Sequence, residues 1–139
     1  MNIKPLSLTV AALMLLGTGL LFPVGVPAAE AQVIAKGQFS GRSGHKVSGT
    51  VEIVKTASGF EVRFADNFKI DGAPGPYLGF GKNGKYVFKT EFSKLRKKRG
   101  KQSYTVPSKI AVTEYDTFFI WCKPYKVPLA IAKLDAGPS

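Results

Sequence analysis

The chain has 139 residues, a formal net charge of +11 at pH 7, one histidine and one cysteine. This length fits one domain with one hydrophobic core. A single histidine and a single cysteine exclude a blue-copper site, which needs two histidines and a cysteine, and a structural zinc site made of four histidine and cysteine ligands.

Residues 1–31 have the pattern of a secretory signal peptide, in which Lys4 precedes an uncharged stretch at residues 5–26. We expect cleavage of this signal helix after residue 31, so that the mature chain begins at Gln32. The protein is then exported and is periplasmic or extracellular. The alternative is an uncleaved anchor, although residues 6–22 are barely long enough to span a membrane. Membrane contact is expected only in that case.

The first part of the mature chain has a β pattern. Residues 47–53 and 60–64 alternate apolar and polar side chains, as half-buried strands do. The short connection at 56–59 predicts that these two strands form a hairpin. Residues 68–70 continue the β pattern, and glycine and proline in residues 71–76 predict a loop.

A second group of strands follows this loop. Residues 77–80 form an apolar strand, and Asn83-Gly84 is a strong hairpin signal before a further strand at 86–88. Residues 103–106 alternate again, and this strand stops at Pro107.

The C-terminal third contains the most apolar strand. Residues 112–115 predict a short helical or 3₁₀ turn, and residues 117–121 predict a central strand that is buried on both faces. Residues 127–134 predict the last strand, and we expect the tail at 135–139 to be frayed. The sequence therefore predicts an all-β fold, a single antiparallel sandwich or barrel-like domain of about seven to nine short strands.

A series of short motifs runs through the mature chain in a fixed order. They are Gly37-x-Phe39, Gly44-His45-x-Val47-Ser48-Gly49, Phe64-x-x-x-Phe68, Gly75-Pro76-x-Leu78, Leu95, Gly100-x-Gln102-x-Tyr104-x-x-Pro107, and Tyr115 through Ile120-Trp121-Cys122-x-x-Tyr125. Together they resemble the DM-thirteen domain, also called the electron-transfer DM-thirteen domain, which often occurs with DOMON domains. The resemblance covers residues 37–134, after a short linker at 32–36.

The resemblance implies a β-rich extracytoplasmic domain with a redox-active cysteine, which acts as a bare thiol or through a bound group such as haem. Cys122 takes the position of that cysteine, and His45 takes that of the family's histidine before Ser-Gly. One departure is Lys101, which replaces a commonly acidic residue after the glycine. A partner recognised through this loop is therefore expected to differ here.

The residues themselves leave several interpretations of Cys122 open. A lone cysteine in an exported protein cannot form an internal disulfide, and its commonest role is that of a small buried hydrophobe. A thiolate would need a nearby cation or metal, and strand alternation points Lys123 away from the sulfur. Haem ligated by Cys122, with His45 or a tyrosine opposite, stays possible without a c-type attachment motif. A bare thiol requires the fewest assumptions.

The neighbouring candidates also have plain interpretations. His45 fits a turn or hydrogen-bonding residue better than a ligand. Trp121 and Tyr125 flank the cysteine, and core packing is favoured over shielding a radical or stacking on a flat cofactor. No Ser/His/Asp arrangement is visible, and Asp71 and Asp116 are interpreted as ordinary loop or strand-edge residues.

A basic run precedes the strand at 103–106. Its default interpretation is a solvated loop, and it would also attract an acidic redox protein, anionic lipid headgroups or acidic polysaccharide. Nucleic acid suits the charge, but export makes it an unexpected partner. The run contains five charged candidates for such binding: Arg96, Lys97, Lys98, Arg99 and Lys101.

Two functions follow from these patterns. The first is an exported redox or electron-transfer module that uses Cys122. The alternative is a non-catalytic extracytoplasmic binding or adhesion module that docks on acidic surfaces through the basic run. Both favour a redox carrier or a binding domain over a stand-alone enzyme.

Overall fold

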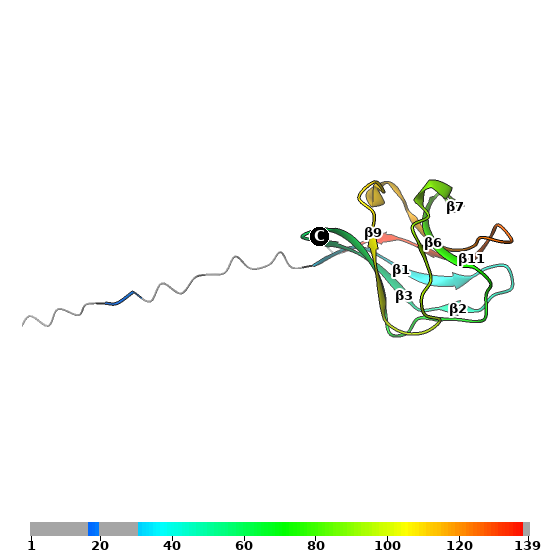
Figure 1. The fold of residues 1–139 in the computed structure, drawn as a ribbon, viewed down its shortest axis with the longest axis horizontal. Helices are drawn as coiled ribbons and strands as arrows, with labels where there is room; N and C mark the ends of the chain where they lie inside the picture. Colours follow the sequence, from blue (N-terminus) through cyan, green and yellow to red (C-terminus); the bar gives the residue numbers. More distant parts are fainter. Residues whose placement is uncertain (1–16, 20–30, 138–139) are drawn as a thin grey trace, which may run out of the picture.

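The computed structural model describes residues 17–19 and 31–137 (Figure 1). The expected signal peptide at residues 1–31 therefore lies almost wholly outside the described residues. Within the described part, no helix has the length and apolarity needed to cross a membrane.

Twelve strands and two 3₁₀ turns make up the described chain. They are β1 (Gln32–Gly41), β2 (Val47–Ser48), β3 (Thr50–Thr56), β4 (Gly59–Phe64), β5 (Lys69–Ile70), β6 (Pro76–Lys82), β7 (Lys85–Tyr86), η1 (Phe88–Thr90), β8 (Ser93–Lys94), β9 (Gln102–Val106), η2 (Val112–Glu114), β10 (Thr117–Cys122), β11 (Val127–Lys133) and β12 (Asp135–Ala136).

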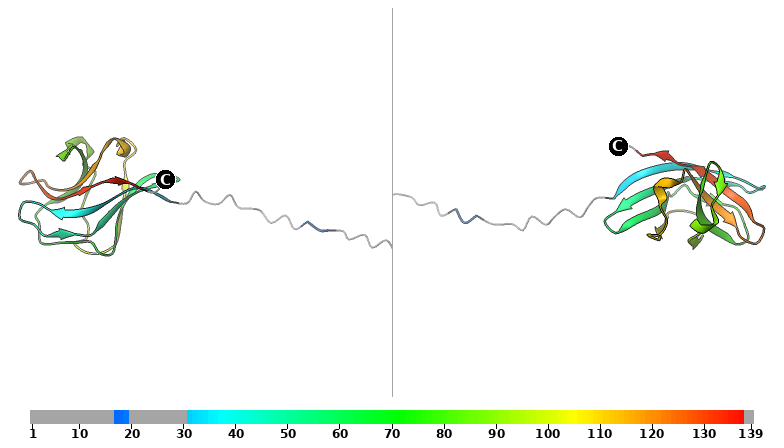
Figure 2. Two further views of the ribbon diagram at one scale, coloured as in Figure 1. Left: turned by 180° about the vertical axis from the view of Figure 1, so that it is seen from behind. Right: turned by 90° about the horizontal axis from the view of Figure 1, so that it is seen from above.

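The strands form one curled antiparallel sheet and a small ribbon. The sheet has the order β7-β6-β10-β11-β1-β3-β4-β9, with β8 paired to β6 and β12 to β1, and β2 pairs with β5. β1 joins the two halves of the sheet, because its first part pairs with β3 and its last three residues pair with β11. The sheet therefore curls into a half-barrel, which Figure 2 shows from behind and from above.

The prediction of an all-β antiparallel fold is confirmed. The number of strands is higher than expected, because the sequence pattern indicates long strands better than very short ones. Seven strands have five or more residues, whereas β2, β5, β7, β8 and β12 have two each. A two-residue ribbon is too short to leave an alternating pattern. This is why the chain has more strands than expected.

Both ends of the expected domain are more ordered than the sequence indicates. The segment 32–36, expected to be a linker, is the first half of β1. Part of the tail expected to fray is β12, which pairs with Ala35 and Lys36 of β1. Gly137 adds a hydrogen bond from its N–H to the Ile34 carbonyl, 2.8 Å away. The start of β1 is therefore held from both sides.

Two predicted strands are interrupted. Gly49 has a φ of 113°, which separates β2 from β3 within the strand expected at 47–53. Phe88, expected in a strand, begins η1 instead. The Thr90 hydroxyl fixes this turn, because it accepts a hydrogen bond from the Phe80 N–H and contacts the Val87 carbonyl.

Other local predictions are confirmed. β3 and β4 form the expected hairpin, and β6 and β7 are joined at Asn83 and Gly84, whose φ values of 52° and 73° suit a tight hairpin turn. The 3₁₀ turn expected near residue 112 is η2.

The interior of the half-barrel is lined by phenylalanine rings. Phe64 lies 4.6 Å from Phe68 and 5.9 Å from Phe118, and Phe80 lies 5.3 Å from Phe118, measured between ring centroids. All six residues of β10 are buried, as expected for a central strand covered on both faces. Side chains of β10 alternate across the sheet, so Phe118 faces the interior together with every second residue after it.

Candidate functional site

Cys122 is the last residue of β10 and faces the interior of the half-barrel. Its side chain belongs to the core cluster and its exposed fraction is 1%. The thiol donates a hydrogen bond to the carbonyl of Pro74, 3.2 Å from the sulfur. Pro74 lies in the loop between β5 and β6, so this loop covers the sulfur. A carbonyl oxygen is a hydrogen-bond acceptor and is not the cation or metal that a thiolate site requires.

The other end of the same loop holds His45. Asp71 lies directly after β5, and its carboxylate accepts hydrogen bonds from the backbone N–H of Lys46 and from His45 Nδ1, both at 3.0 Å. The hydrogen bond from Lys46 lowers the pKa of Asp71, and the hydrogen bond and charge of His45 lower it further. Asp71 is therefore a structural partner of the imidazole. The interpretation of Asp71 as an ordinary loop residue missed these two hydrogen bonds.

His45 and Cys122 thus bind the two ends of one loop. The hydrogen bonds of the described residues join His45 to Asp71 and Cys122 to Pro74. A cavity of about 500 Å³ lies beside His45, and Cys122 is absent from its lining. The cavity beside His45 is therefore not one in which His45 and Cys122 could both ligate a haem.

His45 has a hydrogen bond of the kind that orients metal-binding histidines. Metal-bound histidines commonly donate their other ring N–H to a carboxylate, as His45 does to Asp71. Among the described residues, however, no group of three or more His, Cys, Asp or Glu side chains could hold a metal ion. The arrangement fits a hydrogen-bonding role that fixes the loop.

The outer face of β10 carries an aromatic cluster. Trp121 and Tyr86 stack with ring centroids 4.4 Å apart and an interplanar angle of 8°. Phe88 packs edge-on against Trp121 at 5.5 Å, and its exposed fraction is 63%. A continuous aromatic surface therefore runs from solvent to the residue before Cys122.

Sequence reasoning placed Trp121 in the core and missed Tyr86 as its partner. The Tyr86 side chain lies against Gly79, where a Cβ atom would be 2.7 Å from both the ring carbon Cε2 and the hydroxyl oxygen. Glycine inside a strand often marks a close approach by another group. Gly79 and Gly81 in an otherwise apolar strand were the available signal for this packing.

Charged groups border the aromatic stack. The Tyr86 hydroxyl donates a hydrogen bond to Glu91 Oε2 at 3.2 Å, and Lys123 Nζ lies 2.9 Å from Glu91 Oε1. Burial raises the pKa of Tyr86 above its usual range, and the negative charge of Glu91 and its hydrogen bond raise it further. The same carboxylate raises the pKa of Lys123. Lys123 thus points away from the Cys122 sulfur, as strand alternation predicts.

Tyr125 corrects the expectation of core packing. It lies in the turn between β10 and β11, and its exposed fraction is 71%. Lys126 has a φ of 52°, so this turn is tight and carries Tyr125 outward. Tyr125 does not pack against Cys122 in the core.

The basic segment between β8 and β9 is an ordered loop. The Lys98 carbonyl accepts a hydrogen bond from Ile70 N at 3.0 Å, and Gly100 N donates to the Phe68 carbonyl at 2.9 Å. The Arg96 guanidinium lies 4.3 Å from the Tyr104 ring centroid and bonds the Ser103 carbonyl. The backbone is fixed, while the five basic side chains are exposed: Arg96, Lys97, Lys98, Arg99 and Lys101.

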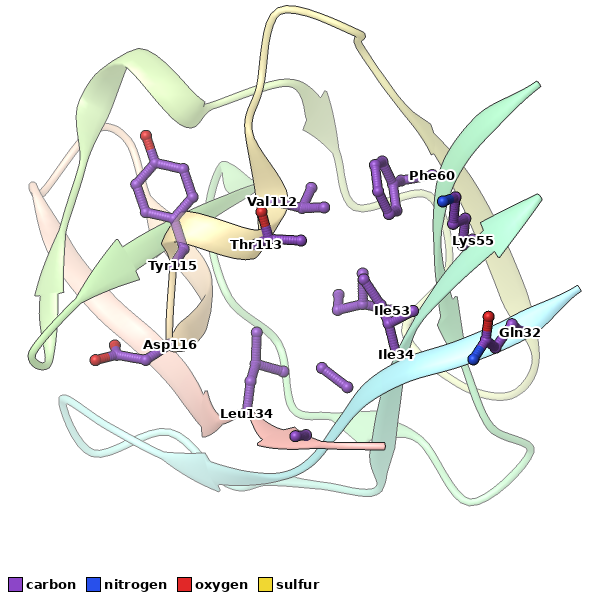
Figure 3. Close-up of a pocket in the computed structure, with 12 residues that line it drawn as sticks. Gln32, Ile34, Ile53, Lys55, Phe60, Val112, Thr113, Tyr115, Asp116 and Leu134 are labelled. Carbon is purple, nitrogen blue, oxygen red and sulfur yellow. The ribbon is translucent and has the colours of Figure 1, made fainter. Parts of the chain in front are cut away.

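A separate pocket of about 460 Å³ lies near the end of β11, whereas Cys122 lies beside its start. Figure 3 shows Ile34, Ile53, Val112 and Leu134 around its centre. Neither Cys122 nor His45 lines it. Sequence reasoning did not find this pocket, because its walls come from strands far apart in the chain.

The family is decided by a sequence comparison. The family described as Electron transfer DM13 matches residues 38–134, which is more than half of the chain. The chain belongs to the electron transfer DM13 family. No curated protein and no solved structure matches it. In this DM13 domain the matched region begins within β1 and contains Cys122, His45, the basic loop and the aromatic stack.

Proposed function

We propose that the protein is an exported electron-transfer module in which Cys122 is the redox group and works as a bare thiol. The observation that carries the proposal is the position of the only cysteine of a DM13 domain beneath a short loop. The same loop binds the family histidine through Asp71. The two residues that the family resemblance singles out are thus joined by one structural element.

The burial of the sulfur bears on the kind of reaction. Thiol–disulfide exchange requires direct attack of a thiolate on a sulfur atom, and access limits its rate. With an exposed fraction of 1%, Cys122 cannot make that contact while the loop is closed. Loss of one electron needs no such contact. In the proposed step, Cys122 gives one electron to a one-electron acceptor protein, and its S–H proton passes to a water molecule that reaches the sulfur when the loop opens briefly. This leaves a thiyl radical, and return of one electron and one proton restores the thiol.

The test uses Cys122→Ser, which keeps a hydroxyl donor for the Pro74 carbonyl. The electrons that the wild-type domain exchanges per chain are counted with a graded series of soluble redox mediators. The serine variant should fold, as judged by circular dichroism, and should exchange one electron per chain fewer than the wild type. A folded serine variant with an unchanged electron count would refute the role of Cys122.

Export is the second part of the proposal. Gln32 is the first residue of β1, so cleavage after residue 31 would leave the whole strand intact. The mass of the protein recovered from outside the cytoplasm should correspond to residues 32–139. A mass that retains residues 1–31 would favour an anchored form instead.

The exposed basic loop supports a docking role as the alternative function. No salt bridge of the described chain involves its five basic side chains, so these charges face solvent. A positive surface of this kind accelerates association with an acidic partner and makes binding salt-dependent. Acidic redox proteins, anionic lipid headgroups and acidic polysaccharides all fit this charge.

The docking role is tested by charge neutralisation. The variant Lys97→Gln, Lys98→Gln, Arg99→Gln and Lys101→Gln should lose salt-sensitive retention on an anionic polymer. A matched control neutralises four exposed lysines elsewhere and changes the net charge equally: Lys55, Lys85, Lys109 and Lys133. Equal loss in both variants would indicate general charge attraction and not a docking loop.

A further inference from the structure

The outer aromatic cluster has the parts of a one-electron site. We propose that Tyr86 and Trp121 form a second redox site on the outer face of the sheet, with Glu91 as the proton acceptor for Tyr86. The inference deepens the proposed electron-transfer function and rests on it for the destination of the electron. The site itself is defined by the contacts of Tyr86.

The first step of the argument concerns the proton. A phenol that loses an electron becomes strongly acidic, so its oxidation is easiest where a base can take the proton at once. The Tyr86 hydroxyl already donates to Glu91 Oε2 at 3.2 Å. Lys123 binds the other carboxylate oxygen at 2.9 Å and holds the carboxylate in place.

The second step compares the five tyrosines, all of which are in the described part of the chain. The Tyr104 hydroxyl is bonded to the amide oxygen of Gln102, which cannot accept a proton at neutral pH. Among the side-chain hydrogen bonds of the described residues, only Tyr86 donates its hydroxyl to a carboxylate. Tyr86 is therefore the tyrosine best placed for proton-coupled oxidation.

The third step concerns the path of the electron. The Tyr86 ring is stacked on Trp121, and Trp121 touches the edge of the exposed Phe88 ring. Trp121 also precedes Cys122 in β10, with the indole on the outer face and the thiol on the inner face. The stack thus lies between the solvent and the buried sulfur.

The reaction is balanced with a one-electron oxidant, which is the docked acceptor protein or a chemical substitute. The oxidant takes one electron from the Tyr86 phenol, and the phenolic proton moves to Glu91 Oε2. The products are a neutral phenoxyl radical, a neutral carboxylic acid and the reduced oxidant. Return of one electron and the same proton restores the starting state.

The experiment uses the mature chain with Cys122→Ser, so that the thiol neither supplies nor quenches a radical. Hexachloroiridate(IV) is the oxidant, and electron paramagnetic resonance after rapid freezing detects the radical. We expect a tyrosyl signal that disappears when Tyr86→Phe is added. The matched control, Tyr125→Phe, removes an exposed tyrosine and should leave the signal unchanged.

The role of Glu91 has its own readout. Glu91→Gln keeps a polar side chain but cannot accept the proton, so it should lower the yield of the radical several-fold. This variant also tests the site if Tyr86→Phe fails to fold. A signal that survives both changes, or that is lost with Tyr125→Phe, would overturn the proposal. Because every sample lacks the thiol, failure here leaves the mediator result on Cys122 intact, and the two proposals fail separately.

Discussion

The two faces of β10 are both buried, yet they hold different chemistry. The inner face carries Phe118, Ile120 and Cys122, whose only polar group is a thiol bonded to a carbonyl. The outer face carries Phe119 and Trp121 in an aromatic cluster bordered by a carboxylate and an ammonium group. Burial alone therefore does not distinguish the two faces of this central strand. The polar groups that border each face do.

The difference arises from the neighbouring strand β6. Its inner positions, Leu78 and Phe80, fill the core with their own side chains. Its outer positions, Gly79 and Gly81, leave space for the Tyr86 and Phe119 rings. Side chains of the sheet strands thus cover the inner face of β10, whereas rings from the segment that follows β6 cover its outer face.

The largest expected effect is the loss of packing on the inner face. Phe118 is fully buried, so Phe118→Ala should lower the free energy of unfolding by about 3–5 kcal/mol, as measured by urea denaturation. The exposed outer ring provides the control, and Phe88→Ala should cost less than about 1 kcal/mol. Equal costs would mean that the outer cluster is as much a part of the core as the inner one.

The next largest effect is expected when a side chain is added on the crowded outer face alone. In Gly79→Ala, the new Cβ would lie 2.7 Å from the Tyr86 ring, which should cost about 1–3 kcal/mol and displace the ring from Trp121. Near-ultraviolet circular dichroism should report the lost stack. Gly72→Ala is the control, because a Cβ there meets nothing within 4 Å. A Gly79→Ala protein with an unchanged aromatic spectrum would contradict the described packing.

The sequence predicted the inner face better than the outer face, for a physical reason. A run of apolar residues at 117–121 is enough to indicate a buried central strand, and the Trp-Cys motif indicated the family. The stack depends instead on the β6–β7 hairpin placing Tyr86 over β10, and the two glycines of β6 indicate only that some group approaches there, without identifying Tyr86. The same holds for the pairing of Asp71 with His45, because it joins two loops from different parts of the chain.

Low pH should destabilise the fold, in part through the loop that covers the inner face. The pKa of Asp71 is lowered by its hydrogen bonds from Lys46 and His45, and that of Asp116 by those from Thr117 and Asn83. Because a lowered folded-state pKa stabilises the ionised fold, this stability is present above the unfolded value, near pH 4, and is lost as the pH falls below it. The free energy of unfolding, measured from pH 7 to pH 2, should therefore decline below about pH 4.

Asp71→Asn tests the part played by this loop. The variant should lose part of the decline in the free energy of unfolding at low pH. It should also speed the reaction of Cys122 with a pyridyl disulfide at neutral pH, because the loop over the sulfur is held less firmly. Asp116→Asn is the matched control, since it lies outside the loop over the sulfur and should flatten the decline without exposing the thiol. Equal thiol reactivity in both variants would show that the Asp71 contacts do not hold this loop.

The smallest effect concerns the charges on the outer face, which alkali should disrupt. The pKa values of Tyr86 and Lys123 are both raised, so their stabilisation is complete below the unfolded values, near pH 10, and is lost as the pH rises above them. Lys123 is largely exposed, with a side-chain exposed fraction of 59%, so solvent screens its ion pair with Glu91. Lys123→Gln should therefore lower the free energy of unfolding at pH 7 by less than Gly79→Ala does. Absorbance of the phenolate during alkaline titration should show a late component that Tyr86→Phe removes and Tyr125→Phe does not. If the late component belongs to another tyrosine, the carboxylate contact on the outer face is not what distinguishes the two faces of β10.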